Sequence, residues 1–130
     1  MAHSKEELRK VTWDSLKDCQ VVFLATIDGN RPRVRPVTLM RKGNALFTVS
    51  RLKSQKLEQI AKNPMVEFAF SLPDIGFNSI RVECTAEIVD DEKIKAETYD
   101  SPEHALIRLV PTRFTVIIPP SFETVTLSPT

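Results

Sequence analysis

The sequence has few of the residues on which common metal and thiol sites depend. Among its 130 residues are two cysteines, Cys19 and Cys84, and two histidines, His3 and His104. Neither cysteine belongs to a C-x-x-C pair and the histidines lack metal-ligand spacing, so we expect no metal centre. Both thiols are predicted to be reduced and mostly buried, as free cysteines usually are.

Long hydrophobic runs are missing as well. The longest apolar run, Val21 to Ala25, is far too short to cross a bilayer. The first ten residues, MAHSKEELRK, are charged and lack the apolar h-region of a signal peptide. We therefore expect a soluble, cytoplasmic protein that has no membrane partner.

The chain also has almost no net charge. Eighteen basic and seventeen acidic side chains give a net charge of +1. This balance argues against bulk DNA or an anionic membrane surface as a partner. The alternating Arg31, Arg33 and Arg35 are the one feature that favours nucleic acid, and we predict no such partner. Arg31 and Arg33 are expected to be surface charges.

Length and composition predict one folded domain over residues 1–130. Apolar residues make up 42% of the chain, which is typical of a globular protein. A chain of this size has room for one hydrophobic core but little interior for a cofactor. A large ligand would lie more naturally in a groove between two copies of the chain.

Three segments have helical patterns. Ser4 to Glu7 has the form of a capping box, which predicts a helix that ends near Asp18. A second helix is predicted over 51–62, closed by Asn63-Pro64, and a short charged one over 90–99.

The remaining pattern is mainly β. Asp28-Gly29 predicts a tight hairpin between strands 20–27 and 31–41. Pro32 and Pro36 lack an N–H, so they predict an edge position. The alternative is a stretch whose backbone groups interact with something other than a neighbouring strand. Further β-rich runs cover 45–50, 65–72, 80–88, 105–110, 113–118 and 122–127. Mostly antiparallel strands, with one helix between the third and fourth, predict a barrel closed by helices rather than a βαβ sheet.

One stretch carries an ordered set of motifs. Leu24 to Val66 reads LATIDGNRPRVRPVTLMRKGNALFTVSRLKSQKLEQIAKNPMV, and RVECTAEIVDDE follows later. Together they resemble the pyridoxamine 5′-phosphate oxidase-like FMN-binding family, in which Cys84 often has glycine as its counterpart. The resemblance implies a six- to seven-stranded antiparallel split β-barrel, Greek-key-like. It also implies a homodimer with FMN at the subunit interface.

The residues themselves predict a phosphate site at the start of the second helix. A helix N-terminus attracts anions, and Lys53, Ser54, Gln55 and Lys56 lie there. The alternative is that Ser54 is a plain N-cap and that the two lysines form a solvated helix face. The resemblance favours phosphate binding.

The rest of the site follows from the resemblance. Arg35 would make forked hydrogen bonds to the phosphate or lie beside the ring system. The backbone of Pro36, Val37, Thr38 and Leu39 would line the isoalloxazine. Strand residues near the ribityl chain and ring would be Phe47, Thr48 and Ser50. The partner subunit's candidates are the segment 78–81, the Arg113-Phe114 pair and Trp13, although a core or interface position suits Trp13 better.

The expected activity is that of an FMN-dependent oxidoreductase acting on an unidentified small molecule. No catalytic side chain can be named, and His104 is expected to be a surface or strand-edge residue. The C-terminal RFTVIIPPSFETVTLSPT has no tryptophan and no second basic cluster, which argues against vitamin B6 oxidation. The alternatives are an electron-transfer module without its own organic substrate, and a split barrel that binds haem or a deazaflavin.

Overall fold

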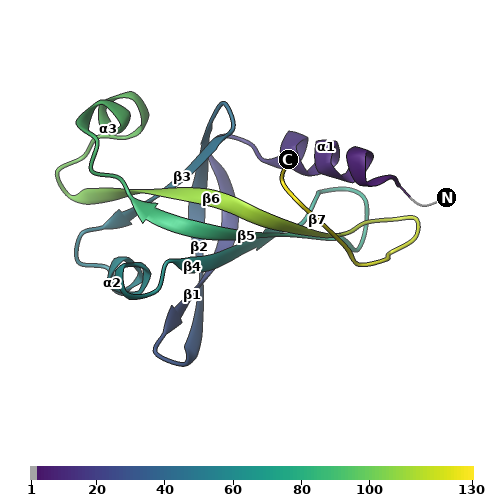
Figure 1. Ribbon diagram of the computed structural model, residues 1–130, viewed down its shortest axis with the longest axis horizontal. Helices are drawn as coiled ribbons and strands as arrows, with labels where there is room; N and C mark the ends of the chain where they lie inside the picture. Colours follow the sequence, from purple (N-terminus) through teal and green to yellow (C-terminus); the bar gives the residue numbers. More distant parts are fainter. Residues whose placement is uncertain (1–2) are drawn as a thin grey trace.

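A computed structural model describes residues 3–130 of the chain (Figure 1). The described residues form three helices and seven strands. In chain order these are α1 (Lys5–Ser15), β1 (Gln20–Asp28), β2 (Arg31–Lys42), β3 (Ala45–Arg51), α2 (Gln55–Lys62), β4 (Met65–Phe70), β5 (Ser79–Ile88), α3 (Glu92–Thr98), β6 (His104–Ile117) and β7 (Val125–Leu127). None of the described helices is long and apolar enough to span a membrane.

The strands form a closed antiparallel barrel. Their order is β3-β2-β1-β4-β5-β6-β7, and β3 also pairs with β6. That pairing closes six strands into a barrel and leaves β7 as an extra strand beside β6. The predicted fold class, mainly β with short helices in a six- to seven-stranded antiparallel barrel, is confirmed.

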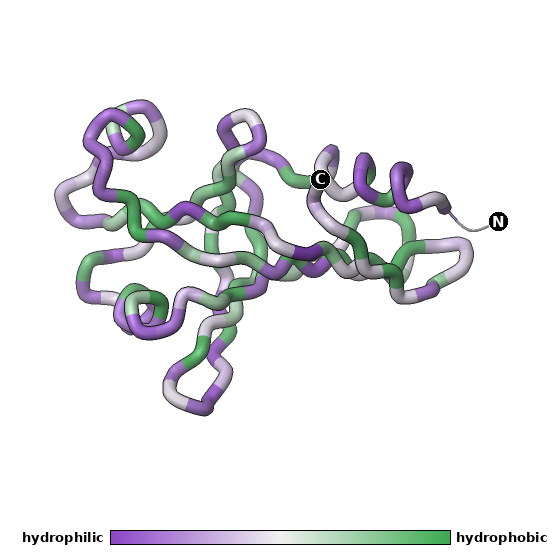
Figure 2. Tube along the Cα trace, in the orientation of Figure 1, coloured by the Kyte–Doolittle hydropathy of each residue, from purple (hydrophilic) through white to green (hydrophobic). Residues whose placement is uncertain are grey.

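The barrel interior is apolar. Alternate residues of the strands point inward, and Leu24, Leu39, Phe68, Ile107 and Phe114 have no exposed surface. Helix α1 lies across one end, with α2 and α3 toward the other (Figure 1). The tip of the β1–β2 hairpin extends away from the barrel and is hydrophilic (Figure 2).

The helix predictions hold with shorter boundaries. Ser4 and Glu7 form the predicted capping box, but α1 ends at Ser15 because Leu16 adopts an extended conformation. Helix α2 begins at Gln55 rather than at residue 51, because Arg51 still belongs to β3 and Ser54 is the N-cap.

Three strand predictions need correction, and the first is the run 122–127, which forms a strand only over Val125–Leu127 in β7. The runs 105–110 and 113–118 form one strand, β6, because a register shift opposite Glu83 and Cys84 accommodates Pro111 within the ladder. The run 65–72 ends at Phe70, since the Asn78 side chain bonds both the N–H and the carbonyl of Leu72.

The edge position predicted from the prolines is confirmed. Strand β2 pairs with β1 from Arg31 to Leu39, but it pairs with β3 only from Met40 to Lys42. Strand β3 pairs with β6 along its other edge, from Leu46 to Arg51. Strands β2 and β3 therefore separate, and the outer edge of β2 before Met40 has no neighbouring strand in the described chain.

Candidate functional site

The opening between β2 and β3 forms a cleft, here called the strand-gap cleft. Its volume is about 770 Å³, within the range of small-molecule sites. The start of α2 and the start of β6 complete its walls. The lining residues are Pro36, Val37, Thr38, Val49, Arg51, Lys53, Ser54, Lys56 and His104.

The strand-gap cleft is basic. Arg51, Lys53 and Lys56 line it, and no lining residue is acidic. Burial, and next the nearby Arg35 guanidinium, lower the pKa of Lys56. Lys56 Nζ donates to the carbonyl oxygen of Val49 at 3.1 Å, and no carboxylate neutralises its charge in the described residues. An anion bound there would offset the cost of holding this buried cation.

The N-terminus of α2 opens on the same cleft. Ser54 is its N-cap, and the Ser54 hydroxyl oxygen accepts from the Lys56 N–H at 3.1 Å. The N-cap alternative is therefore correct as a structural role. The same geometry directs the positive end of the helix dipole, together with Lys56, toward the cleft.

Arg35 contacts α2 through Gln59 and does not line the strand-gap cleft. Its Nη1 donates to Thr26 Oγ1 at 2.7 Å and its Nη2 to Gln59 Oε1 at 2.9 Å. Thr26 Oγ1 in turn donates to Gln59 Oε1 at 2.6 Å. The guanidinium is thus fixed against α2, close enough to Lys56 to affect its pKa.

The other predicted site residues take different positions. Pro36, Val37, Thr38, Lys53, Ser54 and Lys56 come together in the strand-gap cleft. Leu39 and Phe47 place their side chains in the core, which leaves them only a backbone role. Thr48 Oγ1 donates to the Thr38 carbonyl at 2.9 Å, so it links β2 to β3 where the ladder ends.

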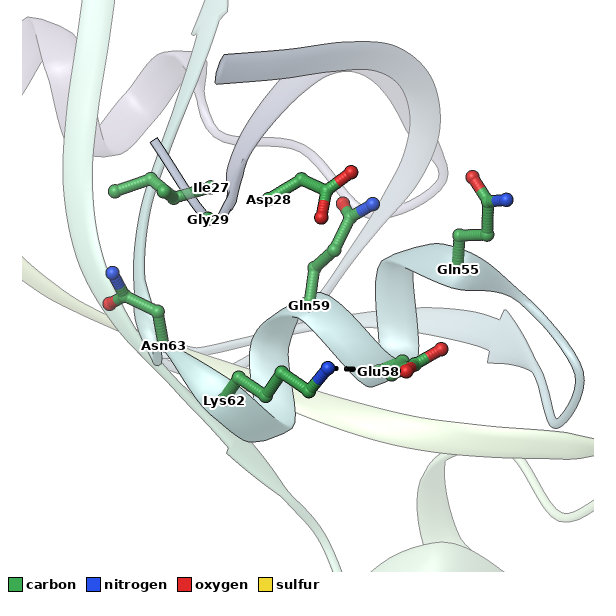
Figure 3. A pocket seen from close by; sticks show the side chains of 8 residues that line it. All are labelled: Ile27, Asp28, Gly29, Gln55, Glu58, Gln59, Lys62 and Asn63. Atoms are coloured by element: carbon green, nitrogen blue, oxygen red, sulfur yellow. Dashed lines mark hydrogen bonds and ion pairs between the residues drawn. The ribbon is translucent and has the colours of Figure 1, made fainter. Parts of the chain in front are cut away.

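Two predicted residues are engaged elsewhere. Ser50 is buried, and its hydroxyl donates to the carbonyl of Arg51. Gln55 lines a different cleft, between α2 and the tip of the β1–β2 hairpin (Figure 3). That second cleft has carboxylates from Asp28 and Glu58 in its walls, so it suits a phosphate less well.

Sequence reasoning missed Arg51 and His104. They face each other in the β3–β6 register, and both line the strand-gap cleft. His104 Nδ1 lies 2.9 Å from Ser101 Oγ, and the Tyr99 ring packs edge-on against the imidazole at 5.7 Å. The two residues are 53 positions apart, and the sequence does not indicate their pairing because only barrel closure brings β6 beside β3.

Four of the residues proposed for the partner side of the site make contacts within their own chain. Trp13 packs edge-on against Phe114 and donates its indole N–H to the carbonyl of Pro129, as suits a structural tryptophan. Asn78 is buried in the β4–β5 loop, and Arg113 forms an ion pair with Glu83.

The comparison with protein families identifies the relationship. The family model described as pyridoxamine 5′-phosphate oxidase matches residues 7–121. The chain belongs to this family. Proteins of the pyridoxamine 5′-phosphate oxidase family commonly bind a flavin.

Individual relatives support this assignment. A pyridoxine/pyridoxamine 5′-phosphate oxidase of Anaplasma marginale (strain St. Maries) is 36% identical over 86 residues, which are 65% of this chain. The match spans only 39% of that relative, so the chain covers well under half of its length. A solved structure from Listeria innocua, named as a candidate pyridoxamine 5′-phosphate oxidase, has 25% identity and a TM-score of 0.74, covering 85% of this chain and 98% of that one.

The fold is shared with a protein that binds another group. The structure of a haem-binding protein from Mycobacterium smegmatis has a TM-score of 0.72 and 12% identity. The alignment covers 99% of this chain and 60% of that one. At this identity the likeness concerns the fold alone.

Proposed function

We propose that the protein is a flavoprotein that binds FMN in the strand-gap cleft. The observation that carries the proposal is a cleft with three basic side chains and no acidic one, which opens on the N-terminus of α2. A phosphate monoester matches this combination of dipole and charge. Family membership independently favours a flavin.

Each part of the cleft suits one part of the cofactor. The phosphate would lie against Ser54, Lys56 and the α2 N-terminus, with Arg35 behind them. The ring system would lie along the outer edge of β2 near Pro36 to Thr38, which has no neighbouring strand in the described residues. The Thr48 hydroxyl bond fixes the Thr38 carbonyl and so positions this edge. FMN supplies hydride or electron transfer when bound, which requires no catalytic side chain.

A second copy of the chain would complete the site. The outer face of the β1–β2 hairpin exposes Val21, Phe23 and Val34, which are 54–69% accessible. Phe23 is the register partner of Pro36, and Pro36 lines the strand-gap cleft. The apolar face is therefore continuous with the open side of the cleft. A contiguous apolar patch of this kind marks an interaction site, and a homodimer would cover both patch and cofactor.

The activity that best fits is oxidoreduction of a small molecule other than a vitamin B6 phosphate. Residues 113–130 contain no tryptophan and no second basic cluster, and this composition argues against a vitamin B6 phosphate as the substrate. An electron-transfer module without an organic substrate is the alternative role for the same cofactor. Because the haem-binding protein from Mycobacterium smegmatis has the same fold, haem is the alternative ligand.

An absorption spectrum of the purified protein tests these possibilities. Flavin bands, restored by adding FMN to stripped protein, would support the proposal, and a Soret band would favour haem instead. Protein that stays colourless after incubation with FMN would contradict it. Bleaching of bound flavin by NADH or NADPH, followed by turnover with an acceptor, would separate an enzyme from an electron carrier.

A further inference from the structure

The second cleft and the strand-gap cleft are lined by different residues of α2. The second cleft opens between one face of α2 and the tip of the β1–β2 hairpin, with a volume of about 370 Å³ (Figure 3). Three amide side chains, spaced four residues apart along α2 and its C-cap, line it: Gln55, Gln59 and Asn63. Asp28 lines it from the hairpin. None of these residues lines the strand-gap cleft.

Gln59 supplies a fixed hydrogen-bond donor. The residue is only 6% exposed, and its Oε1 accepts from both Thr26 Oγ1 and Arg35 Nη2. Both bonds require an oxygen at that position, so the amide orientation is determined and Nε2 is left for the cleft. Among residues 3–130, no acceptor for Gln59 Nε2 is found. No side-chain N or O that is buried from solvent lacks a partner in the described residues, so Nε2 reaches solvent and is open to a ligand.

Asn63, one helical turn after Gln59, also has its amide oxygen engaged and its amide nitrogen free to donate. Its Oδ1 accepts from the N–H of Met65 at 3.1 Å, which leaves Nδ2 as a donor. Asn63 follows Gln59 by four positions, so both amides lie on the same side of α2. The cleft therefore has two amide donors whose oxygen atoms are already engaged.

The hairpin side supplies an acceptor. The Asp28 carboxylate lies in the cleft wall, and its Arg33 partner is exposed and 3.5 Å away. Glu58 adds a second carboxylate, with Lys62 at 3.4 Å. Two carboxylates disfavour an anionic ligand, whereas an N–H group of a neutral ligand would pair well with Asp28.

We infer that this second cleft binds an uncharged, planar heterocycle with an imide edge, of the nucleobase or nucleoside class. An imide edge has a carbonyl on each side of one N–H, which complements two amide donors and one carboxylate acceptor. The Ile27 side chain adds an apolar wall for the ring. The inference does not depend on the cofactor proposal, because the two clefts are lined by different residues of α2.

The test is titration of the purified protein with uridine, followed by the NMR signals of the side-chain amides. Uridine has the imide edge, and 3-methyluridine has its N–H blocked. Gln59→Glu and Asn63→Asp each keep an acceptor oxygen for the native contact but replace the amide donor. Asn44→Asp, at the distant β2–β3 turn, makes the same chemical change as a control.

Saturable binding of uridine should shift the Gln59 and Asn63 amide signals, and 3-methyluridine should bind more weakly. Each of the two cleft variants should weaken uridine binding by about tenfold or more, because a hydrogen bond is lost and a repulsive charge gained. Asn44→Asp should bind like the wild type. Failure of uridine to bind at millimolar concentration, or equal binding by the wild type and both cleft variants, would overturn the inference. Measuring FMN affinity on the same samples keeps this outcome separate from the cofactor proposal.

Discussion

At the scale of single residues, Lys56 combines a structural cost with a binding role. Its ammonium is half-buried beside Arg35, and both features lower its pKa below the ordinary value of 10.5. Between the lowered pKa and 10.5 the unfolded chain therefore binds more protons than the folded chain. The contribution of Lys56 to the free energy of unfolding must then rise with pH across that window.

A Lys56→Met variant tests this cost. Without the cofactor, the variant should lose the part of the alkaline rise in stability that comes from Lys56. Urea unfolding of wild type and variant at several pH values between 8 and about 10.5 would show the difference. A parallel pH dependence in both proteins would contradict this account of Lys56.

The two cysteines differ in a way that the sequence did not predict. Cys84 is buried in β5 and burial raises the pKa of its thiol, but Cys19 is exposed in the turn between α1 and β1. The expectation of two buried thiols is therefore wrong for Cys19. Its backbone adopts a positive φ of 61°, which places it in a tight turn outside the core.

Thiol labelling under native conditions should distinguish the two residues. An aromatic disulfide reagent should modify Cys19 readily, whereas Cys84 should react only after unfolding, since its thiolate is strongly disfavoured. The Cys19→Ser variant should show no fast-reacting thiol. Rapid labelling of that variant in its folded state would contradict the assignment.

At the scale of elements, α2 contributes different residues to the two clefts, and its N-cap belongs to the proposed phosphate site. At both N-caps a serine oxygen accepts from a backbone N–H, Ser54 at α2 and Ser4 at α1. The two serines offer a matched pair for separating stability from binding.

Ser54→Ala and Ser4→Ala should each lower the free energy of unfolding by about 1 kcal/mol, the usual cost of losing an N-cap. Only Ser54→Ala should also weaken FMN binding, because Ser4 lies on a helix that does not line the strand-gap cleft. Chemical denaturation and FMN titration of both variants measure the two effects. Equal FMN affinities in the two variants would argue against the phosphate position.

Local patterns predicted the elements better than they predicted contacts between them. The capping box, the Asp28-Gly29 hairpin and the proline-marked edge of β2 depend on neighbouring residues, so they are readable from the sequence. The continuity of β6 through Pro111 depends on a bulge shared with β5, and His104 joins the cleft only through barrel closure. Arg35 was expected at the phosphate, but its partners Thr26 and Gln59 come from β1 and α2.

At the scale of the whole molecule, the apolar face of the β1–β2 hairpin predicts self-association. Phe23 and Val34 would be costly to leave in water beside a binding cleft. A homodimer formed through this face would also cover the open side of the strand-gap cleft.

A Phe23→Glu variant should therefore sediment as a monomer, while the wild type sediments as a dimer. Phe122→Glu is the control, because Phe122 is similarly exposed, at 50% against 54%, but lies in the loop after β6. Analytical ultracentrifugation of the three proteins makes the comparison. A monomeric wild type, or a dimer that persists in Phe23→Glu, would refute this interface.

The most direct test of the central claim is a fluorescence titration of FMN and riboflavin with wild type, Lys56→Ala and Lys62→Ala. The account predicts that the wild type binds one FMN per chain and binds riboflavin much more weakly, because only FMN has the phosphate. Lys56→Ala should lose about 10- to 100-fold in FMN affinity, as expected for one charged hydrogen bond, and Lys62→Ala should lose almost none. Equal affinities for FMN and riboflavin, or an FMN affinity that does not change in Lys56→Ala, would contradict it.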